Sequence, residues 1–298
     1  MPVIPKELFE IYPDKEGRER INNIITRDCP AVSSYCIGKS MYGMPLDVLI
    51  VGNGGGRVAF FGAHHALEAL TSNVLYAFVY NLSCASEQGK KVAGIDARLL
   101  LELCTFYVLP TVNPDGVELV RHGAGCSPIS KRLEQLCGGD FSDWQANGRG
   151  VDLNHNYSFG FAEYKRLETE RGITSGARLY SGEYPESEPE SHSVAAFVRA
   201  LAPSLVASLH SQGEEIYSMP RTAYGDRLGR RAAALCGYCH TVPSGTACFG
   251  GLCDYTGALG IPSLTVEVGR GRNPLPINDS RAAFYRILPC LARLPMLL

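Results

Sequence analysis

The chain has 298 residues, of which 45% are hydrophobic and 19% charged, and its formal net charge at pH 7 is −2. This composition supports a sizeable apolar core in one large or two small domains, and the near-neutral charge argues against a nucleic-acid partner. The apolar runs fall well short of the roughly 20 residues that cross a bilayer, so the sequence predicts no membrane partner either.

The N-terminal sequence and the cysteines bear on the compartment. The first twenty residues lack a continuous apolar stretch after basic residues, so they do not resemble a secretory signal. We therefore expect a cytoplasmic protein, provided that Met1 is the natural start. The eleven cysteines are scattered, and in that compartment we expect most of them to be reduced and buried as small apolar side chains.

Two apolar segments, at 45–53 and 57–65, are typical of strands, and the glycines at 54–56 between them predict a hairpin. The segment GNGGG does not match a dinucleotide-binding loop. Arg57 stands where the third glycine is needed, and a strand follows instead of a helix. From residue 66 to residue 82 the apolar spacing becomes helical.

The rest of the chain alternates further strands with helices. Residues 99–116 predict the end of a helix, a buried strand and a tight Asn-Pro-Asp-Gly turn. Residues 117–150 are polar and glycine-rich, which is typical of a long surface loop. Ser187 and Glu190 form a capping box that predicts a helix start. The remaining predicted elements are a strand at 203–213, a helix at 222–239, a strand at 261–269 and a terminal helix at 278–294, kinked at Pro289. This alternation predicts an α/β sheet with both faces covered.

Three of the predicted strands end in side chains that suit a metal site. One strand ends at His65, a second at His210, and a third carries Glu267 near its end. In open α/β sheets the ligand site lies off the carboxyl ends of the strands, so we expect these side chains at one edge. Glu68, three residues after His65, adds a carboxylate within reach of the same point.

Two histidines and one carboxylate, with a fourth position left for water, are the ligands of a catalytic zinc ion. His65, Glu68 and His210 fit this count, which leaves Glu267 as a base near the metal but not bound to it. A histidine at a strand end is more often structural, and His64, which points away from His65, is interpreted in that way.

Six motifs in chain order then resemble the zinc carboxypeptidase family. They are HHALE, LPTVNPDGVEL, GRGVDLNHNY, SEPES, SLHSQGEEIY and DYTGALGIPSLTVEVGRGRNPLP. The resemblance is strongest to bacterial γ-D-glutamyl-L-diamino acid and γ-D-glutamyl-meso-diaminopimelate peptidases. It implies a single domain over residues 1–298, built on a mixed, mostly parallel, twisted sheet flanked by helices, with residues 1–40 as an N-terminal extension packed on it. It also implies one zinc ion per chain, held by His65, Glu68 and His210, a known ligand set of this family, with Glu267 as the general base.

The resemblance also implies roles for residues around these motifs. Asp152 would accept a hydrogen bond from His65 and orient it. An arginine just upstream of the GVDLN segment would stabilise the oxyanion. Arg149 is the best match, with Gln145 at an alternative position.

The substrate-binding residues depart from the exopeptidase pattern. Asn154 is present, but His155 replaces the arginine that would bind a terminal carboxylate, and histidine lacks the rigid bidentate fork of arginine. Arg270 or Arg272 could bind a substrate carboxylate instead, and Tyr255 lies near the site in sequence.

The sequence therefore predicts a zinc metallopeptidase that hydrolyses a peptide derived from the bacterial cell wall. The alternatives are a carboxypeptidase that removes C-terminal residues, a zinc deacylase of N-acyl amino acids and a binding protein without activity. The segment CGYCH at 236–240 matches a haem-attachment pattern, which we set aside because no export signal is visible. A second, structural zinc site would need Cys236, Cys239, Cys248 and Cys253.

Overall fold

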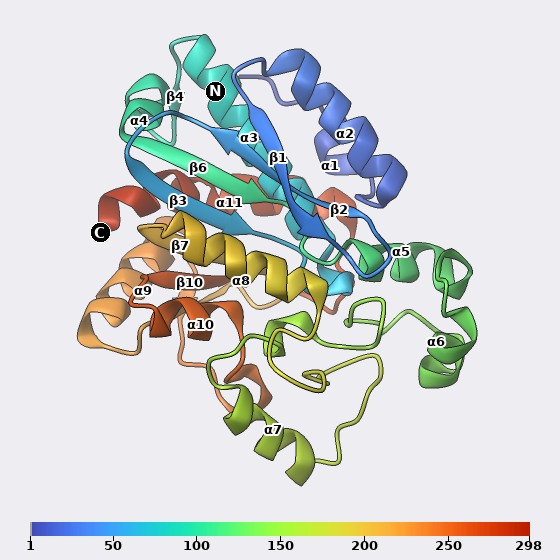
Figure 1. Cartoon of the computed structure of the whole chain (residues 1–298). Coiled ribbons are helices and arrows are strands. Elements are labelled where there is room, and N and C mark those ends of the chain that lie inside the picture. Colours follow the sequence, from blue (N-terminus) through green and yellow to red (C-terminus); the bar gives the residue numbers. More distant parts are fainter. Residues whose placement is uncertain (1) are drawn as a thin grey trace.

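Eight strands form one sheet in the order β1-β2-β6-β3-β7-β10-β8-β9 in this computed structural model, which describes residues 2–298 (Figure 1). The strands are β1 (Ser33–Lys39), β2 (Pro45–Val51), β3 (Gly56–Phe61), β6 (Cys104–Leu109), β7 (Leu205–His210), β8 (Glu215–Met219), β9 (Cys239–His240) and β10 (Ser263–Glu267). The four central strands β6, β3, β7 and β10 run parallel, whereas β1 and β2 on one side and β8 on the other make antiparallel pairs. A separate two-stranded sheet pairs β4 (Lys91–Val92) with β5 (Ile95–Asp96).

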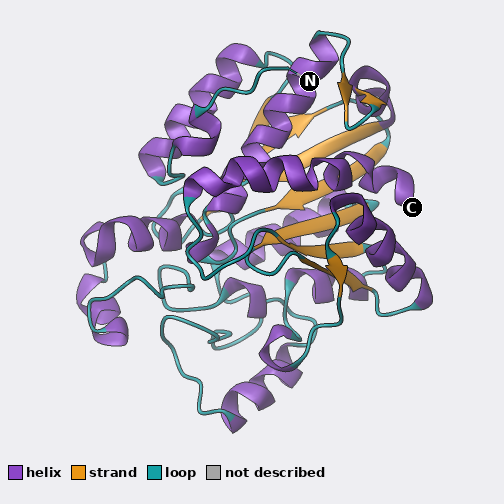
Figure 2. Cartoon of the chain, turned by 180° about the vertical axis from the view of Figure 1, so that it is seen from behind, coloured by secondary structure: helices purple, strands orange, loops and turns teal. Residues whose placement is uncertain are grey.

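Helices cover both faces of the sheet, as Figures 1 and 2 show from opposite sides. One face packs against α3 (Leu70–Glu87), α9 (Ala223–Cys236) and α11 (Ser280–Arg293), and the other against α8 (Pro189–Leu201) and α10 (Leu252–Ala258). Successive strand residues point to opposite faces, so Phe60 lies in the first core and Phe61 in the second. The prediction of an α/β domain with a mixed sheet and a parallel centre is therefore confirmed.

The other helices lie around this framework. They are α1 (Glu7–Glu10), α2 (Lys15–Asp28), α4 (Ala97–Leu103), α5 (Pro114–His122), α6 (Ser130–Cys137) and α7 (Phe161–Glu170). Among residues 2–298, none of the helices combines the length and the apolar character that crossing a bilayer requires.

The predicted hairpin of β2 and β3 is wrong, because β6 lies between the two strands. β2 pairs antiparallel with β6, and β3 pairs parallel with the other edge of β6. The glycines between β2 and β3 allow close backbone approach instead of a tight turn. A Cβ on Gly54 would lie 2.2 Å from the backbone nitrogen of Cys104, where β6 begins. The N–H groups of Asn53 and Gly54 both donate to the Leu101 carbonyl, which fixes this crossing.

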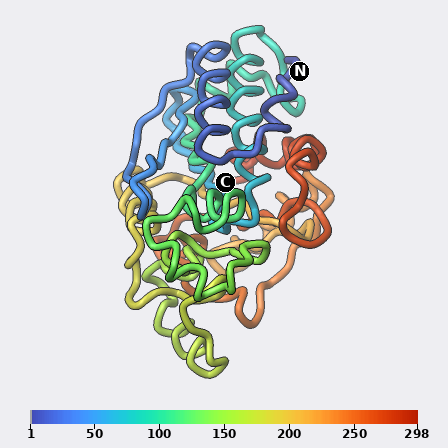
Figure 3. Tube along the Cα trace, turned by 90° about the vertical axis from the view of Figure 1, so that its right-hand side faces the viewer, coloured from blue at the N-terminus to red at the C-terminus, as the bar shows by residue number. Residues whose placement is uncertain are grey.

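The Asn-Pro-Asp-Gly segment starts a helix and does not form the predicted tight turn. Asn113 caps α5 by accepting a hydrogen bond from the Gly116 N–H, and Pro114 occupies the first helical turn, where its missing N–H costs nothing. Residues 117–150 are also more ordered than expected, since they contain most of α5 and all of α6. Their apolar side chains, with Trp144 fully buried, form a small core of their own. Figure 3 shows this green segment below the N-terminal helices.

Helix α8 begins where predicted, but a distant residue caps it. The Ser187 hydroxyl donates to Glu188, and the Oε1 atom of Glu190 accepts the N–H of Met41, so the predicted capping box does not form. The Oδ1 atom of Asn156 accepts the Glu188 N–H at 3.2 Å instead. A tertiary contact thus replaces the local one.

The N-terminal extension is shorter than predicted. Residues 33–39 form the edge strand β1 of the main sheet, so they are part of the framework. The preceding helices α1 and α2 pack on α3, where the buried Asn73 amide donates to the carbonyls of Leu8 and Ile11, both at 2.8 Å.

Two buried carboxylates hold the turn between β1 and β2. Asp115 accepts hydrogen bonds from the Ser40 hydroxyl and the Tyr42 N–H, and Glu190 accepts the Met41 N–H at 3.0 Å. Burial, reinforced by the Asp115 carboxylate, raises the pKa of Glu190 to about 8. Burial also raises the pKa of Asp115 to about 6, although its two hydrogen bonds oppose the shift.

The Glu190 pKa predicts a loss of stability with rising pH. The ordinary value for Glu is 4.5, so between pH 4.5 and 8 the folded state retains a proton that the unfolded state has released. The free energy of unfolding should therefore fall across this window by up to about 1.4 kcal/mol per pH unit from this group. Glu190→Gln keeps an acceptor for Met41 and has no charge to lose, so its stability should fall less between pH 5 and pH 8. Urea unfolding of the protein at several pH values measures this difference. The exposed Glu170→Gln is the control, and equal pH dependence in wild type and Glu190→Gln would refute the assignment.

Candidate metal-binding active site

The candidate site lies at the carboxyl ends of three adjacent parallel strands. β3 leads into the loop that carries His65, β7 ends at His210, and β10 ends at Glu267. His210 and Glu267 are register partners, so their side chains leave neighbouring strands on the same face. The strand ends thus bring together residues that are up to about 200 positions apart in the chain.

Local hydrogen bonds shape the loop after β3. A Cβ on Gly62 would lie 2.8 Å from the Pro110 carbonyl oxygen, so this close approach requires glycine. The Thr71 hydroxyl accepts the N–H of Ala63 and donates to the carbonyl of Glu68. The amide of Asn113 donates to the carbonyl of His64 at 3.1 Å. The helix cap of α5 therefore also holds the metal-ligand loop.

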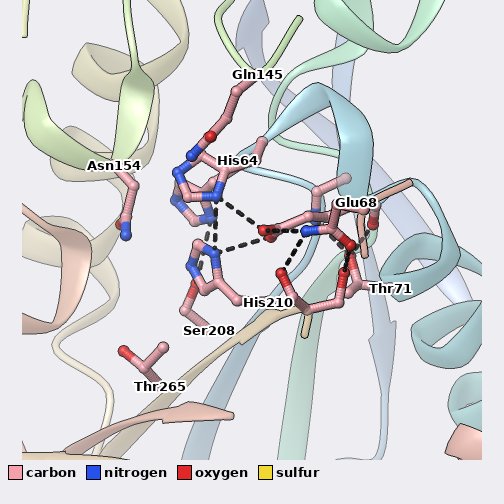
Figure 4. A network of polar contacts seen from close by, with 12 residues as sticks. His64, Glu68, Thr71, Gln145, Asn154, Ser208, His210 and Thr265 are labelled. Atoms are coloured by element: carbon pink, nitrogen blue, oxygen red, sulfur yellow. Dashed lines mark hydrogen bonds and ion pairs between the residues drawn. The ribbon is translucent and has the colours of Figure 1, made fainter. Parts of the chain in front are cut away.

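His65, Glu68 and His210 point their donor atoms at one another. Figure 4 shows Glu68 and His210 of this group, with Ser208 beside His210. The Nδ1 atom of His65 lies 3.1 Å from Oε1 of Glu68, the Nδ1 atom of His210 lies 3.0 Å from Oε2 of Glu68, and the two Nδ1 atoms are 3.3 Å apart. Within residues 2–298, this is the one group of at least three His, Cys, Asp or Glu side chains close enough to share an ion.

This donor set fits zinc. Tetrahedral ligand atoms at about 2.0–2.1 Å from zinc lie about 3.3 Å apart, which is close to the observed separations. Two imidazole nitrogens and a carboxylate that converge in a buried site also need a cation, because their lone pairs would otherwise repel one another. The residues present can therefore hold a zinc ion.

Polar partners fix the orientation of the ligands. Asp152 accepts a hydrogen bond from Nε2 of His65 at 3.1 Å, which leaves Nδ1 free to bind a metal, as the sequence had suggested. The amide of Asn273 donates to Oε1 of Glu68 at 3.2 Å. The Ser208 hydroxyl lies 3.0 Å from Nε2 of His210 and 3.2 Å from Nδ1 of His64.

Sequence reasoning missed two of these partners. Ser208 stands two residues before His210 on the same strand, and the period of two places both on one face, so the spacing could have indicated it. Asn273 lies in the GRGRNPLP motif, but its contact with Glu68 spans 205 positions and has no local signal. His64 is buried as expected, and its Nε2 atom lies 2.9 Å from the Tyr157 hydroxyl.

The ionisable groups influence one another strongly. Burial opposes the ionisation of Glu68, but the imidazoles of His65 and His210 outweigh it and lower the pKa of Glu68 to about 2. Burial also opposes the charge on Asp152, yet His65 and His155 hold the pKa of Asp152 well below its usual range. Burial and the Glu68 carboxylate raise the pKa of Glu267 well above its ordinary value. A divalent ion in the site would counteract this repulsion between the two carboxylates.

A cavity opens beside these residues and receives some of the predicted substrate-binding side chains. Asn154, His155 and Gln145 line it together with His65 and Glu267. The His155 ring stacks flat on Tyr164, with centroids 3.8 Å apart, and its Nδ1–H donates to the Phe249 carbonyl.

The structure places Arg149 away from this cavity. Its guanidinium makes a bidentate ion pair with Glu188 at 2.8 and 2.9 Å and lines a separate cavity. Gln145 takes the position beside the candidate metal ligands, where its amide nitrogen lies 3.4 Å from Oδ2 of Asp152. Of the two positions that the sequence offered for the oxyanion donor, the structure thus places Gln145 in the cavity beside the candidate ligands and Arg149 in a separate one.

Two further side chains that the sequence predicts to bind substrate, Arg270 and Tyr255, also lie outside this cavity. Arg270 extends into solvent, pairs with Glu214 at 2.8 Å and lines a cavity that does not include the candidate ligands. Tyr255 is buried under α8, where its hydroxyl accepts a hydrogen bond from Arg199. Arg272, in contrast, lines a second cavity that includes His65 and Glu68.

The cysteines do not assemble a second metal site in the described part of the chain. Cys236 contacts the carbonyls of its own helix, Cys248 contacts the carbonyl of Pro243, Cys253 contacts the hydroxyl of Thr265, and Cys239 is exposed. All eleven cysteines are free thiols in the described structure, and seven of them are buried.

Comparison with known proteins agrees with the geometry of the candidate zinc site. The family model described as zinc carboxypeptidase matches residues 19–233. The chain is 28% identical to γ-D-glutamyl-L-diamino acid endopeptidase 1 of Lysinibacillus sphaericus, over 87% of this chain and 66% of that protein. It is 30% identical to YqgT of Bacillus subtilis, whose function is uncharacterised, over 92% of this chain and 74% of that protein. The chain thus spans about two thirds of the endopeptidase's length.

The fold matches solved structures as well. The crystal structure of thrombin activatable fibrinolysis inhibitor superposes with a TM-score of 0.73 at 22% identity, covering 98% of this chain and 76% of the other. At this identity the match supports the fold alone.

The geometry around His65 predicts that Asp152 strengthens metal binding. Asp152→Asn removes the negative charge that polarises His65, so zinc affinity should fall by about 10-fold to 100-fold. Competition with a chromophoric chelator measures the affinity. Asp140→Asn, at an exposed carboxylate of the same loop region, is the matched control and should bind zinc as the wild type does. An unchanged affinity in Asp152→Asn would contradict the orienting role.

Proposed function

Because the chain belongs to the zinc carboxypeptidase family, whose members hydrolyse peptide bonds, we propose that it cleaves the amide bond between γ-D-glutamate and a diamino acid in peptides derived from bacterial cell walls. The diamino acid is meso-diaminopimelate or a related residue. The cytoplasmic location expected from the N-terminal sequence stays a prediction.

One observation carries the catalytic part of this proposal. The donor atoms of His65, Glu68 and His210 converge within 3.3 Å of one another, and Glu267 stands next to His210 on the adjacent strand. Three ligands and one unbound carboxylate are the parts that metal-assisted hydrolysis of an amide requires. His65 and Glu267 line both of the adjoining cavities, His210 lines the first and Glu68 the second.

Each side chain has a distinct task in this mechanism. Zinc held by His65, Glu68 and His210 would supply a Lewis acid that polarises the scissile carbonyl and activates water. Glu267 accepts the proton of the attacking water and delivers it to the leaving amine, because it is the carboxylate that lies beside the ligand group without belonging to it. Asp152 keeps His65 in the tautomer that presents Nδ1 to the metal.

Gln145 is the best-placed donor for the oxyanion. It lines both cavities next to His65 and Glu267, whereas Arg149 is bound to Glu188. A preorganised amide N–H stabilises the charge that develops on the carbonyl oxygen. Because it is neutral, it provides less stabilisation than a guanidinium at the same place would.

The proposed substrate class rests on the relative from Lysinibacillus sphaericus and on His155. The name of that relative states action on γ-D-glutamyl-L-diamino acid bonds. In this chain His155 lies where an exopeptidase carries arginine, and it is stacked on Tyr164 and bonded to Phe249. Its ring cannot form the bidentate contact that selects a C-terminal carboxylate.

The central experiment combines a substrate assay with one variant. The wild type, incubated with a γ-D-glutamyl-meso-diaminopimelate tripeptide, should release the diamino acid, as identified by mass spectrometry. Glu267→Gln should keep one zinc per chain and lose about 10²-fold to 10⁴-fold in kcat, because the proton acceptor is gone. Normal turnover by Glu267→Gln would exclude the base role. If the protein instead released C-terminal residues from ordinary peptides, it would be a carboxypeptidase. If it hydrolysed only N-acyl amino acids, it would be a deacylase.

A second pair of variants tests the oxyanion donor. Gln145→Ala should lower kcat by about 10²-fold with little change in KM, since the contact forms in the transition state. Arg149→Gln should leave the kcat of folded, zinc-loaded protein nearly unchanged and lower its thermal stability, because Glu188 remains buried without its partner. If Arg149→Gln lowered kcat more than Gln145→Ala did, Arg149 would be the oxyanion donor instead.

A further inference from the structure

A second cavity adjoins the candidate metal ligands and carries two arginines. It shares His65, Gln145, Tyr217 and Glu267 with the first cavity, which places it beside the same reacting centre. On its outer side it is lined by Arg178, Arg272 and Asp143.

The two arginines meet at one carboxylate that does not saturate them. The Asp143 Oδ1 atom lies 3.4 Å from a terminal nitrogen of Arg178 and 3.7 Å from one of Arg272. Both separations exceed the 2.7–2.9 Å of a strong charge-assisted hydrogen bond. The Arg178 side chain is 45% exposed and that of Arg272 is 86% exposed. At this outer side two guanidiniums face one carboxylate, which leaves a local excess of positive charge with many N–H donors unused, while Glu68 and Glu267 line the inner side toward the candidate metal ion.

Two other arginines, in contrast, each make a close ion pair. Arg149 is held by Glu188 at 2.8 Å, and Arg270 by Glu214 at 2.8 Å. Neither lines the second cavity. Within the second cavity, Arg178 and Arg272 are therefore the positive groups that no close ion pair holds.

The first cavity has a different charge pattern. It contains Asp254, whose carboxylate accepts only a 3.2 Å hydrogen bond from the Gly251 N–H in the described structure, and Arg221, which contacts the Cys248 sulfur. Charges of both signs suit a zwitterionic group, which is the free end of a diamino acid. The two arginines at the outer side of the second cavity suit a single anion.

A γ-linked glutamyl residue presents such an anion. Its scissile carbonyl belongs to the side chain, so its α-carboxylate is free and lies one glutamyl side-chain length from the reacting carbon. In an ordinary peptide that position carries no such charge. A cationic subsite next to the metal would therefore distinguish the two kinds of bond.

We propose that Arg178 and Arg272, gathered around Asp143, form a subsite that binds the free α-carboxylate of a γ-linked glutamyl residue on the acyl side of the scissile bond. This inference rests on the proposed function. It adds the chemical group that selects the acyl residue, and it assigns the zwitterionic diamino acid to the first cavity.

The test compares two substrates that differ at one group. One is the γ-D-glutamyl-meso-diaminopimelate tripeptide, and the other has the glutamyl α-carboxylate converted to a carboxamide. The wild type should show a kcat/KM at least about 10-fold higher on the carboxylate substrate, mainly through KM, because the amide cannot form the charge-assisted contacts. Arg178→Gln and Arg272→Gln should each lose most of this preference while hydrolysing the carboxamide nearly as fast as the wild type does.

A matched control and a second analogue sharpen the result. Arg270→Gln removes an exposed arginine from the same loop as Arg272 but from another cavity, so its preference should equal that of the wild type. Zinc content and melting temperature confirm that the variants are folded. A substrate amidated on the diamino acid carboxylate should be discriminated equally by wild type and both variants. If the arginine variants change that discrimination instead, the assignment of the two cavities is overturned.

The failures of the two proposals are distinct. If the wild type hydrolyses neither γ-glutamyl substrate, the proposed function fails. If it hydrolyses both equally well, or if the variants retain the preference, the proposed function stands and the arginine subsite is refuted.

Discussion

The convergence of two imidazoles and one carboxylate at the ends of parallel strands is the constraint on which the site depends. β3, β7 and β10 are neighbours in the sheet, and their carboxyl ends lie at one edge. A shift of one residue in the pairing of β7 with β10 would turn Glu267 to the opposite face from His210. The two cores on either side of the sheet hold this register, because each strand alternates its apolar residues between them.

Hydrogen bonds from surrounding side chains hold the candidate metal ligands in position. Asp152 and Asn273 reach His65 and Glu68 from distant loops, and Ser208 lies beside His210. Such partners orient the ligand atoms and set their basicity, which is why buried metal sites rarely consist of ligands alone. The cap of α5 belongs to the same network, since Asn113 donates both to His64 and to the carbonyl of Ala146, next to Gln145.

Charge is distributed unevenly around the reacting centre. Burial, together with the nearby Glu68 carboxylate, raises the pKa of Glu267. Farther out, Asp254 and Arg221 line one adjoining cavity, and Arg178 and Arg272 lie around Asp143 at the outer side of the other. Under the proposed function, selectivity among peptides would depend on these outer groups, because the groups at the metal site would act on the scissile carbonyl and not on the residues that flank it.

The sequence by itself determined the fold class, the main helices and strands, and the residues that converge at the site. Apolar periodicity and the H-x-x-E spacing are local, and strand-end residues of parallel sheets meet at one edge by topology. Only the tertiary structure decided that β6 separates β2 from β3, that Asn156 caps α8, and that Gln145 replaces Arg149 beside the ligands. These outcomes depend on contacts between residues far apart in the chain. A local sequence pattern specifies whether a segment forms a helix or a strand, whereas the free energy of packing decides which other elements it contacts.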